Sequence, residues 1–162
     1  MSSEQNQMIL ESGGGSRFLS CIREELFYFI DTQYQTKPDD RTLFGYSFGG
    51  TFGVYTLFNQ PDTFQRYIIC APDLNWDNQI CFSYESDFAD KCADLPVKLY
   101  LAVGTLDEDL IDHNFSLLVK FHAIIQSRNY QGLDMKFDIF DGETHLTAPL
   151  PTVSRGLRAV FG

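Results

Sequence analysis

Gly45-Tyr46-Ser47-Phe48-Gly49-Gly50 is the stretch of this sequence that decides the fold. It is a Gly-x-Ser-x-Gly pattern between an apolar run with strand character, Arg41 to Phe44, and a run with apolar residues at helical spacing, Thr51 to Asn59. A sharp turn from strand to helix exposes the serine at its tip, so Ser47 is a candidate nucleophile. The alternative is a tight turn that merely contains a serine.

The glycines on either side of the serine fit the same turn. We expect a Cβ at Gly45 or Gly49 to collide with the adjoining strand or helix.

Strand-like and helix-like segments alternate along the chain. An amphipathic helix of about five turns is expected after an N-cap at Ser16. The other expected segments are strands at Arg41–Tyr46, Arg66–Cys70, Val97–Val103 and Met135–Phe140, helices at Phe48–Asn59, Asp112–Arg128 and Leu150–Phe161, and an irregular stretch at Ala71–Asp94. Four strands joined by helices imply right-handed crossovers and a parallel sheet, so the predicted fold class is a layered α/β architecture.

Functional groups should gather at the carboxyl ends of these strands. A serine hydroxyl needs a general base, and histidine is the usual one. His145 is the candidate, because it lies in a loop just after the last strand. A packing role is expected for His122 in the middle of a helix, and a capping-turn role for His113 near a helix start.

The acid that orients the histidine is expected in the loop after the third strand. Asp107 is the first candidate there because it is closest to the strand end. Glu108 and Asp109 are expected in a solvated first turn of the next helix. Those two residues, Glu143 and no acid at all remain the alternatives.

The oxyanion formed during acyl transfer needs N–H donors. The backbone N–H of Phe48, at the start of its helix, is one expected donor. A second should come from a loop after an earlier strand, and the sequence offers no such strand.

Composition excludes several classes of function. The 162 residues carry 12 Lys and Arg against 22 Asp and Glu, a net charge of -10 without a basic run, so no nucleic-acid partner is expected. The four cysteines are spaced too irregularly for a metal site, and we expect free thiols and neither a metal nor an organic cofactor. Without a signal peptide or an apolar run long enough to span a bilayer, we expect a cytoplasmic protein that does not enter membranes.

With these residues in place, the chain resembles the α/β-hydrolase putative-esterase family, which includes the enterochelin-type siderophore esterases and S-formylglutathione hydrolase. The resemblance runs from about Gly13 to Phe161, and its order of Ser, acid and His is that of an α/β-hydrolase. The motifs that carry it are Gly13-Gly14-Gly15-Ser16 with Phe18-Leu19, the Arg41 strand with the Ser47 turn, Ala71-Pro72-Asp73-Leu74-Asn75-Trp76, Leu99-Tyr100-Leu101-Ala102-Val103-Gly104, Glu143-Thr144-His145 and Arg155-Gly156-Leu157-Arg158.

The resemblance implies a three-layer sandwich with a mostly parallel sheet. It also implies that residues 1–162 form one partial domain, the C-terminal portion of such an enzyme, because the family carries further strands and the first oxyanion loop before this region. An uncovered sheet edge and apolar side chains would follow, and they predict self-association into a homo-oligomer.

The function expected from these residues is a serine esterase that hydrolyses carboxylic esters through an acyl-enzyme on Ser47. Tyr46 and Trp76 would line the site for a small-molecule ester, with siderophore-type esters implied by the resemblance. The family usually has Ser-Pro-Ser and an aromatic pair where this chain has Ala71-Pro72-Asp73 and Trp76. The alternative is a catalytically impaired remnant or an interaction domain of such a hydrolase.

Overall fold

The structure is a computed structural model, and it describes residues 13–108 and 113–162 of the chain. The chain divides into two compact units, Met1–Pro38 and Asp39–Gly162. We call them the N-terminal unit and the sheet unit, and each is considered by itself.

In its described residues, 13–38, the N-terminal unit contains one helical run, divided into α2 (Gly15–Cys21), the π-helical turn η1 (Ile22–Leu26) and α3 (Phe27–Gln33). The predicted helix is therefore present, with a π-helical interruption that its apolar spacing does not reveal. The predicted N-cap at Ser16 is wrong, because the helix begins one residue earlier and no side chain caps it. Gly13, at φ +98°, turns the chain into the helix without a capping side chain.

Where the sheet unit is described, at residues 39–108 and 113–162, it contains four strands: β1 (Thr42–Tyr46), β2 (Arg66–Cys70), β3 (Lys98–Gly104) and β4 (Asp134–Phe140). They form one sheet in the order β1-β2-β3-β4, and every neighbouring pair is parallel. Its helices are α4 (Phe48–Asn59), the 3₁₀ turn η2 (Pro61–Thr63), α5 (Trp76–Ala89), α6 (Asn114–Arg128) and α7 (Pro149–Phe161). The predicted parallel α/β sheet is confirmed.

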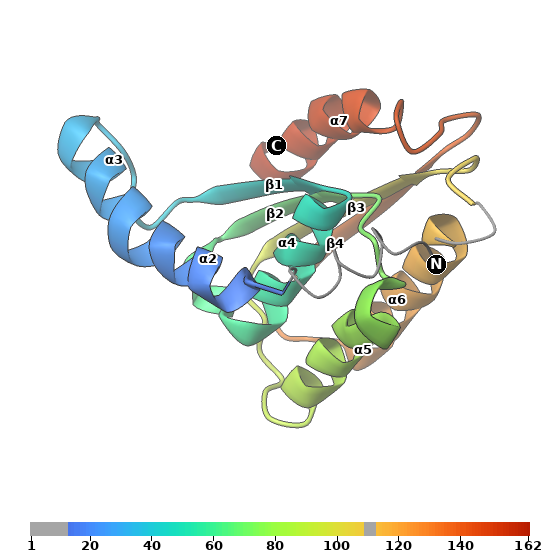
Figure 1. Cartoon of the computed structure of the whole chain (residues 1–162), viewed down its shortest axis with the longest axis horizontal. Coiled ribbons are helices and arrows are strands. Elements are labelled where there is room, and N and C mark those ends of the chain that lie inside the picture. The colour runs from blue at the N-terminus through green and yellow to red at the C-terminus, as the bar shows by residue number, and fades with distance from the viewer. Residues whose placement is uncertain (1–12, 109–112) are drawn as a thin grey trace, which may run out of the picture. The chain divides into compact units, whose positions relative to one another are not determined.

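Helices cover both faces of this sheet (Figure 1). A Cβ on Gly53 of α4 would lie 3.2 Å from the side chain of Ile69, and one on Gly156 of α7 would lie 2.6 Å from that of Ile68. Consecutive strand residues point to opposite faces, so α4 and α7 lie on opposite sides of β2. The two glycines allow this close packing. The result is a three-layer arrangement in which the central strands β2 and β3 are buried.

The prediction of an irregular stretch from Ala71 to Asp94 is wrong, because α5 occupies much of it. Its buried face consists of Cys81 and Glu85, four residues apart. The Glu85 carboxylate is 1% exposed and accepts hydrogen bonds from the Arg128 guanidinium and the Tyr130 hydroxyl at 2.7–3.0 Å. A buried glutamate does not add to apolar periodicity, so the sequence pattern misses this helix.

The prediction about the two glycines beside Ser47 is confirmed for one and wrong for the other. A Cβ on Gly45 would overlap the backbone carbonyl of Gly49, whereas a Cβ on Gly49 would meet nothing within 4 Å. The reason is direction: position 45 points from the strand end toward the first turn of α4, and position 49 points away from it.

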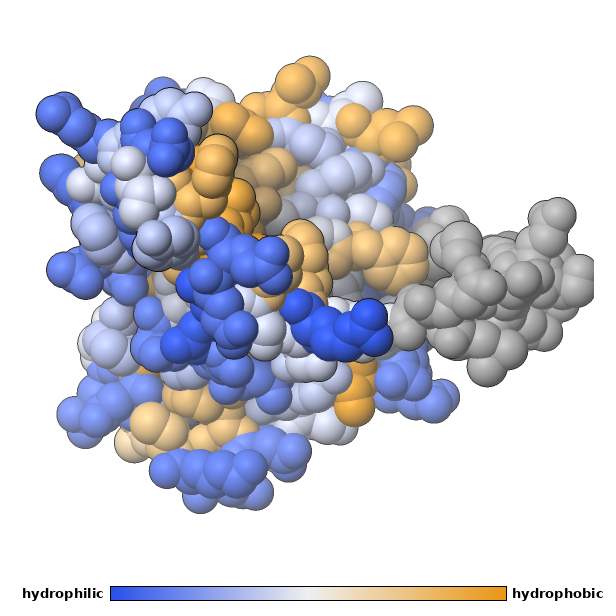
Figure 2. Space-filling view, turned by 60° about the vertical axis from the view of Figure 1, so that its left-hand side comes forward, coloured by the Kyte–Doolittle hydropathy of each residue, from blue (hydrophilic) through white to orange (hydrophobic). Residues whose placement is uncertain are grey.

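Apolar side chains lie exposed at one edge of the sheet unit and along one of its helices. Phe44 on the edge strand β1 is 43% exposed. A stripe along α7 and the turn before it remains uncovered, and orange side chains mark it at the top of Figure 2; its members are Leu146, Leu150, Val153, Leu157 and Phe161. The predicted self-association remains a prediction that this surface supports.

Two buried thiols predict how stability changes in alkali. Burial raises the pKa of Cys70 to about 11 and that of Cys81 to about 12, from an ordinary value of 9.0. Because the pKa is higher in the folded state, the thiols ionise more readily in the unfolded chain. The free energy of unfolding therefore keeps its full value below pH 9 and falls as the pH rises toward 11.

We therefore expect the melting temperature to fall as the pH rises from about 9 toward 11, an interval in which the buried tyrosines, whose pKa values are also raised, contribute to the fall as well. The melting temperature of a Cys70→Ala/Cys81→Ala variant should fall by less over the same pH interval, whatever its value at neutral pH. Circular dichroism melts of both proteins measure this, and an equal fall in the two would contradict the assignment to these thiols.

Candidate functional site

Ser47 lies at the turn between β1 and α4 in a conformation rare for a non-glycine residue, with φ 54° and ψ -126°. Its backbone N–H donates a hydrogen bond to the carbonyl of Cys70, 3.2 Å away at the end of β2. The close approach of Gly45 to the Gly49 carbonyl fixes the other side of the turn. Strain held in this way by surrounding contacts is typical of functional turns.

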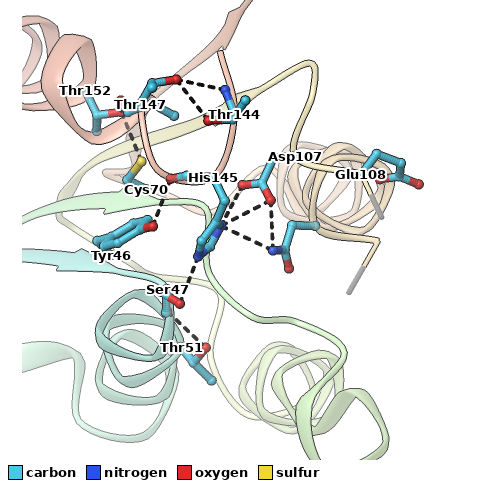
Figure 3. Close-up of polar contacts among 12 residues, drawn as sticks. Tyr46, Ser47, Thr51, Cys70, Asp107, Glu108, Thr144, His145, Thr147 and Thr152 are labelled. Carbon is cyan, nitrogen blue, oxygen red and sulfur yellow. Dashed lines mark hydrogen bonds and ion pairs between the residues drawn. The ribbon is translucent and has the colours of Figure 1, made fainter. Parts of the chain in front are cut away.

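His145 comes from the loop between β4 and α7 and reaches Ser47, 98 residues away in sequence. Its Nε2 lies 3.1 Å from the Ser47 Oγ (Figure 3). Its Nδ1 lies 2.9 Å and 3.1 Å from the two carboxylate oxygens of Asp107. An ionised carboxylate only accepts hydrogen bonds, so Nδ1 carries the hydrogen and Nε2 is free to accept from the serine hydroxyl.

Asp107 is held firmly in the loop after β3. Its side chain is 6% exposed, its N–H donates to the Gly104 carbonyl at 3.2 Å, and its carbonyl accepts from the Phe115 N–H at 2.8 Å. The histidine loop packs directly on this one. The Leu106 N–H donates to the Glu143 carbonyl at 3.0 Å, and a Cβ on Gly104 would overlap that same carbonyl. These contacts bring the acid and the imidazole together.

Among the described residues, Asp107 is the acid that bonds to His145, and neither Glu108 nor Glu143 does so. Glu108 instead caps the next helix: its carboxylate accepts hydrogen bonds from the Ser116 hydroxyl at 2.6 Å and the Ser116 N–H at 3.0 Å, and these bonds lower its pKa. Glu143 contributes its backbone carbonyl to the loop packing, and Asp109 lies outside the described residues.

The other two histidines lie elsewhere. The ring of His122 packs against Phe137 with centroids 4.5 Å apart, and burial lowers its pKa, in keeping with a packing role. His113 immediately precedes α6, and its Nδ1 lies 3.4 Å from a carboxylate oxygen of Glu108.

The two aromatic residues expected to line a substrate site have other contacts in the structure. The Tyr46 hydroxyl donates to the His145 carbonyl at 2.8 Å, and its ring lies 4.8 Å from the imidazole centroid, so Tyr46 supports the histidine loop. Trp76 is half-buried at the start of α5, and its backbone N–H donates a hydrogen bond to the Asp73 carboxylate at 3.1 Å. Substrate contact by either ring remains a prediction.

Phe48 is the first residue of α4, directly after the serine. The N–H groups of a first helical turn have no intrahelical carbonyl to bond. The Phe48 N–H is therefore free to bind an anion beside Ser47, with the helix dipole favouring negative charge there.

Asn114 is a site residue that sequence reasoning missed. It is 3% exposed, its Nδ2 donates to Asp107 Oδ1 at 3.1 Å, and the same nitrogen lies 3.5 Å from His145 Nδ1. Its own Oδ1 is buried without a hydrogen-bond partner among the described residues. The only sequence signal is an asparagine at a helix start seven residues after Asp107, and it does not indicate this contact.

Asp73 is the second residue that sequence reasoning missed. Its Oδ1 accepts hydrogen bonds from the N–H groups of Asn75 and Trp76, each at 3.1 Å. Its carbonyl accepts from the Thr51 hydroxyl at 2.9 Å, and that hydroxyl also lies 3.3 Å from the carbonyl of Ser47. The sequence signal was its position just beyond the carboxyl end of β2.

No group of three or more His, Cys, Asp or Glu side chains that could hold a metal ion occurs among residues 13–108 and 113–162. Within the same residues, every helix is too short or too polar to cross a membrane.

Comparison with known proteins agrees with this geometry. The family model described as "Putative esterase" matches residues 4–148. Ferri-bacillibactin esterase BesA of Bacillus subtilis (strain 168) is 31% identical over 153 residues, which cover 91% of this chain and 52% of that protein. The chain thus spans about half the length of this relative.

Solved structures, among them the following two, are also similar to the chain. The BES protein from Bacillus cereus matches with a TM-score of 0.83 and 27% identity, over 92% of this chain and 55% of that one. The siderophore hydrolase EstA from Aspergillus nidulans matches with a TM-score of 0.81 and 19% identity, over 90% of this chain and 56% of that one, and supports the fold alone. The resemblance predicted from the motifs is confirmed.

Proposed function

The chain belongs to the putative-esterase family, and from that premise we propose that it hydrolyses carboxylic esters through an acyl-enzyme on Ser47. The observation that carries this proposal is the continuous line of hydrogen bonds from Ser47 through His145 to Asp107. A serine hydroxyl becomes an effective nucleophile when an oriented imidazole can take its proton.

In the proposed reaction, His145 Nε2 takes the hydroxyl proton as Ser47 Oγ bonds to the ester carbonyl carbon. The Phe48 N–H stabilises the negative charge on the carbonyl oxygen. The carbon–oxygen bond to the alcohol then breaks, and His145 returns the proton to the leaving alkoxide. Water then gives a proton to His145 as its oxygen bonds to the acyl carbon, the bond from that carbon to Ser47 Oγ breaks, and His145 returns the proton to Oγ. The acid is released and Ser47 is restored. Asp107 remains ionised and holds the imidazole in place, and no cofactor is required.

Relatives named for siderophore esters suggest the first substrates to screen. The acyl-enzyme itself can be tested with a simple activated ester. After brief incubation with p-nitrophenyl acetate and an acid quench, peptide mass spectrometry should find one acetyl group on Ser47. Acetylation spread over surface lysines, with none on Ser47, would contradict the proposed nucleophile.

A non-catalytic interaction domain is the second candidate function. It is favoured by the exposed apolar side chain of Phe44 on the edge strand β1 and by the apolar stripe of α7. Concentration-dependent sedimentation, together with absence of acylation on a folded sample, would support this candidate instead.

Asn114 provides a test of the proposed acid. Asn114→Leu removes the amide that donates to Asp107 and should lower kcat about tenfold, a magnitude typical of groups that support a catalytic residue. Folding stability should change by less than about 1 kcal/mol, because the variant also removes a buried oxygen without a partner. Ester hydrolysis and urea unfolding measure the two effects, and an unchanged kcat would contradict a role for Asn114 in holding Asp107.

A further inference from the structure

A carboxylate that the proposed reaction does not use lies next to the Ser47 turn. The segment that ends in Asp73 continues from β2, whose last carbonyl, of Cys70, accepts the Ser47 N–H at 3.2 Å. The same segment packs against the first turn of α4, where a Cβ on Gly50 would lie 3.1 Å from the Cα of Pro72. The segment that carries Asp73 therefore lies against the Ser47 turn.

The Asp73 side chain is fixed in orientation. Two backbone N–H groups, of Asn75 and Trp76, bind Oδ1, and none of the described residues donates a hydrogen bond to Oδ2. The Thr51 hydroxyl joins the Asp73 carbonyl to α4, the helix that begins directly after the serine. One carboxylate oxygen is thus available to a ligand, while the other holds the group in place.

The charge of Asp73 acts on the reaction centre. Burial raises the pKa of the Asp73 carboxyl above its usual value, while the two N–H groups and the nearby His145 imidazole hold it down. His145 in turn contacts Ser47, so the field of Asp73 reaches the position of the scissile carbonyl. A half-buried carboxylate is less screened than one on the open surface, so it attracts a nearby cation more strongly and repels an anion.

We propose that Asp73 makes this site select esters that carry a positively charged group, such as an ammonium, close to the scissile carbonyl. This substrate class rests on the proposed ester hydrolysis at Ser47. The overall charge of -10 also attracts cations from a distance. A single fixed carboxylate beside the site adds a local preference, which distinguishes a charged ester from an uncharged ester of equal size.

Binding and turnover can be measured separately with acetylcholine and its uncharged carbon isostere, 3,3-dimethylbutyl acetate. In the Ser47→Ala chain, which cannot turn either over, NMR titration should give a Kd about tenfold lower for the cation. Adding Asp73→Asn should make the two Kd values equal, because the amide still accepts the two backbone N–H bonds but carries no charge. The difference should also shrink at high salt.

Asp77→Asn is the matched control, because it removes one exposed carboxylate from the start of α5, four residues along the chain, and changes the net charge equally. It should leave the tenfold difference intact. Equal binding of both esters, no binding of either, or a preference that survives Asp73→Asn would each overturn the proposal. Hydrolysis by the Ser47-containing chain tests the proposed function on its own: turnover without a cation preference refutes only the substrate class, and a preference without turnover refutes only the esterase activity.

Discussion

Ser47→Ala is expected to lower kcat for ester hydrolysis by about 10⁴-fold or more while the protein stays folded. The variant removes the oxygen that bonds to the substrate but keeps the backbone N–H that donates to the Cys70 carbonyl. Steady-state rates with p-nitrophenyl butyrate and a thermal melt measure the two properties. Ser154→Ala, on the exposed side of α7, is the control and should change neither.

Replacing His145 in the Ser47→Ala variant should cause little further loss of kcat. Residues that act as one unit are strongly non-additive, because the first removal already disables the others. Ser47→Ala/His145→Ala should therefore be about as slow as Ser47→Ala. A single Ser47→Ala variant that retains most of the activity would mean that hydrolysis occurs elsewhere on the chain.

Gly45→Ala is expected to destabilise the fold by about 3 kcal/mol and to abolish activity. Its Cβ would overlap the backbone carbonyl of Gly49, and neither backbone segment can give way without moving the Ser47 turn. Gly49→Ala is the matched control, since its Cβ meets nothing within 4 Å and alanine favours a helix.

Urea unfolding of the two glycine variants compares them directly. Gly49→Ala should unfold at the same urea concentration as the unsubstituted chain or a higher one. A Gly45→Ala chain that does not fold at all is the extreme form of the expected result. Equal unfolding midpoints for the two variants would contradict the close approach at the turn.

Most of the sheet could be predicted from the sequence because its strands carry a local signal. Buried runs such as Leu99 to Val103, between turn residues, indicate a parallel strand whatever lies beside it. Helix α5 carries no such signal, since the side chain that fixes its buried face is Glu85, paired with Arg128 from 43 residues away. Long-range polar pairing of this kind cannot be inferred from apolar spacing.

The candidate site divides in the same way. Ser47, Asp107 and His145 could be named because each follows a strand, and parallel strands bring their carboxyl ends together. Asn114 could not, because its contact with Asp107 depends on how the start of α6 packs on the loop after β3. Asp73 does follow a strand, but nothing in the local pattern marks its carboxylate as part of a site. The two glycines beside the serine are a similar case. The sequence pattern predicts a clash for a Cβ at either glycine, and only the direction of the backbone shows that the clash occurs at Gly45 and not at Gly49.

The most direct test of the account is labelling of the purified 162-residue chain with a fluorophosphonate, followed by peptide mass spectrometry. Such a probe reacts with a serine that has both an activating base and an oxyanion site. We expect rapid formation of one adduct, on Ser47. The Ser47→Ala variant should form none, and His145→Ala should form it much more slowly. A folded chain that forms no adduct on Ser47 would contradict it.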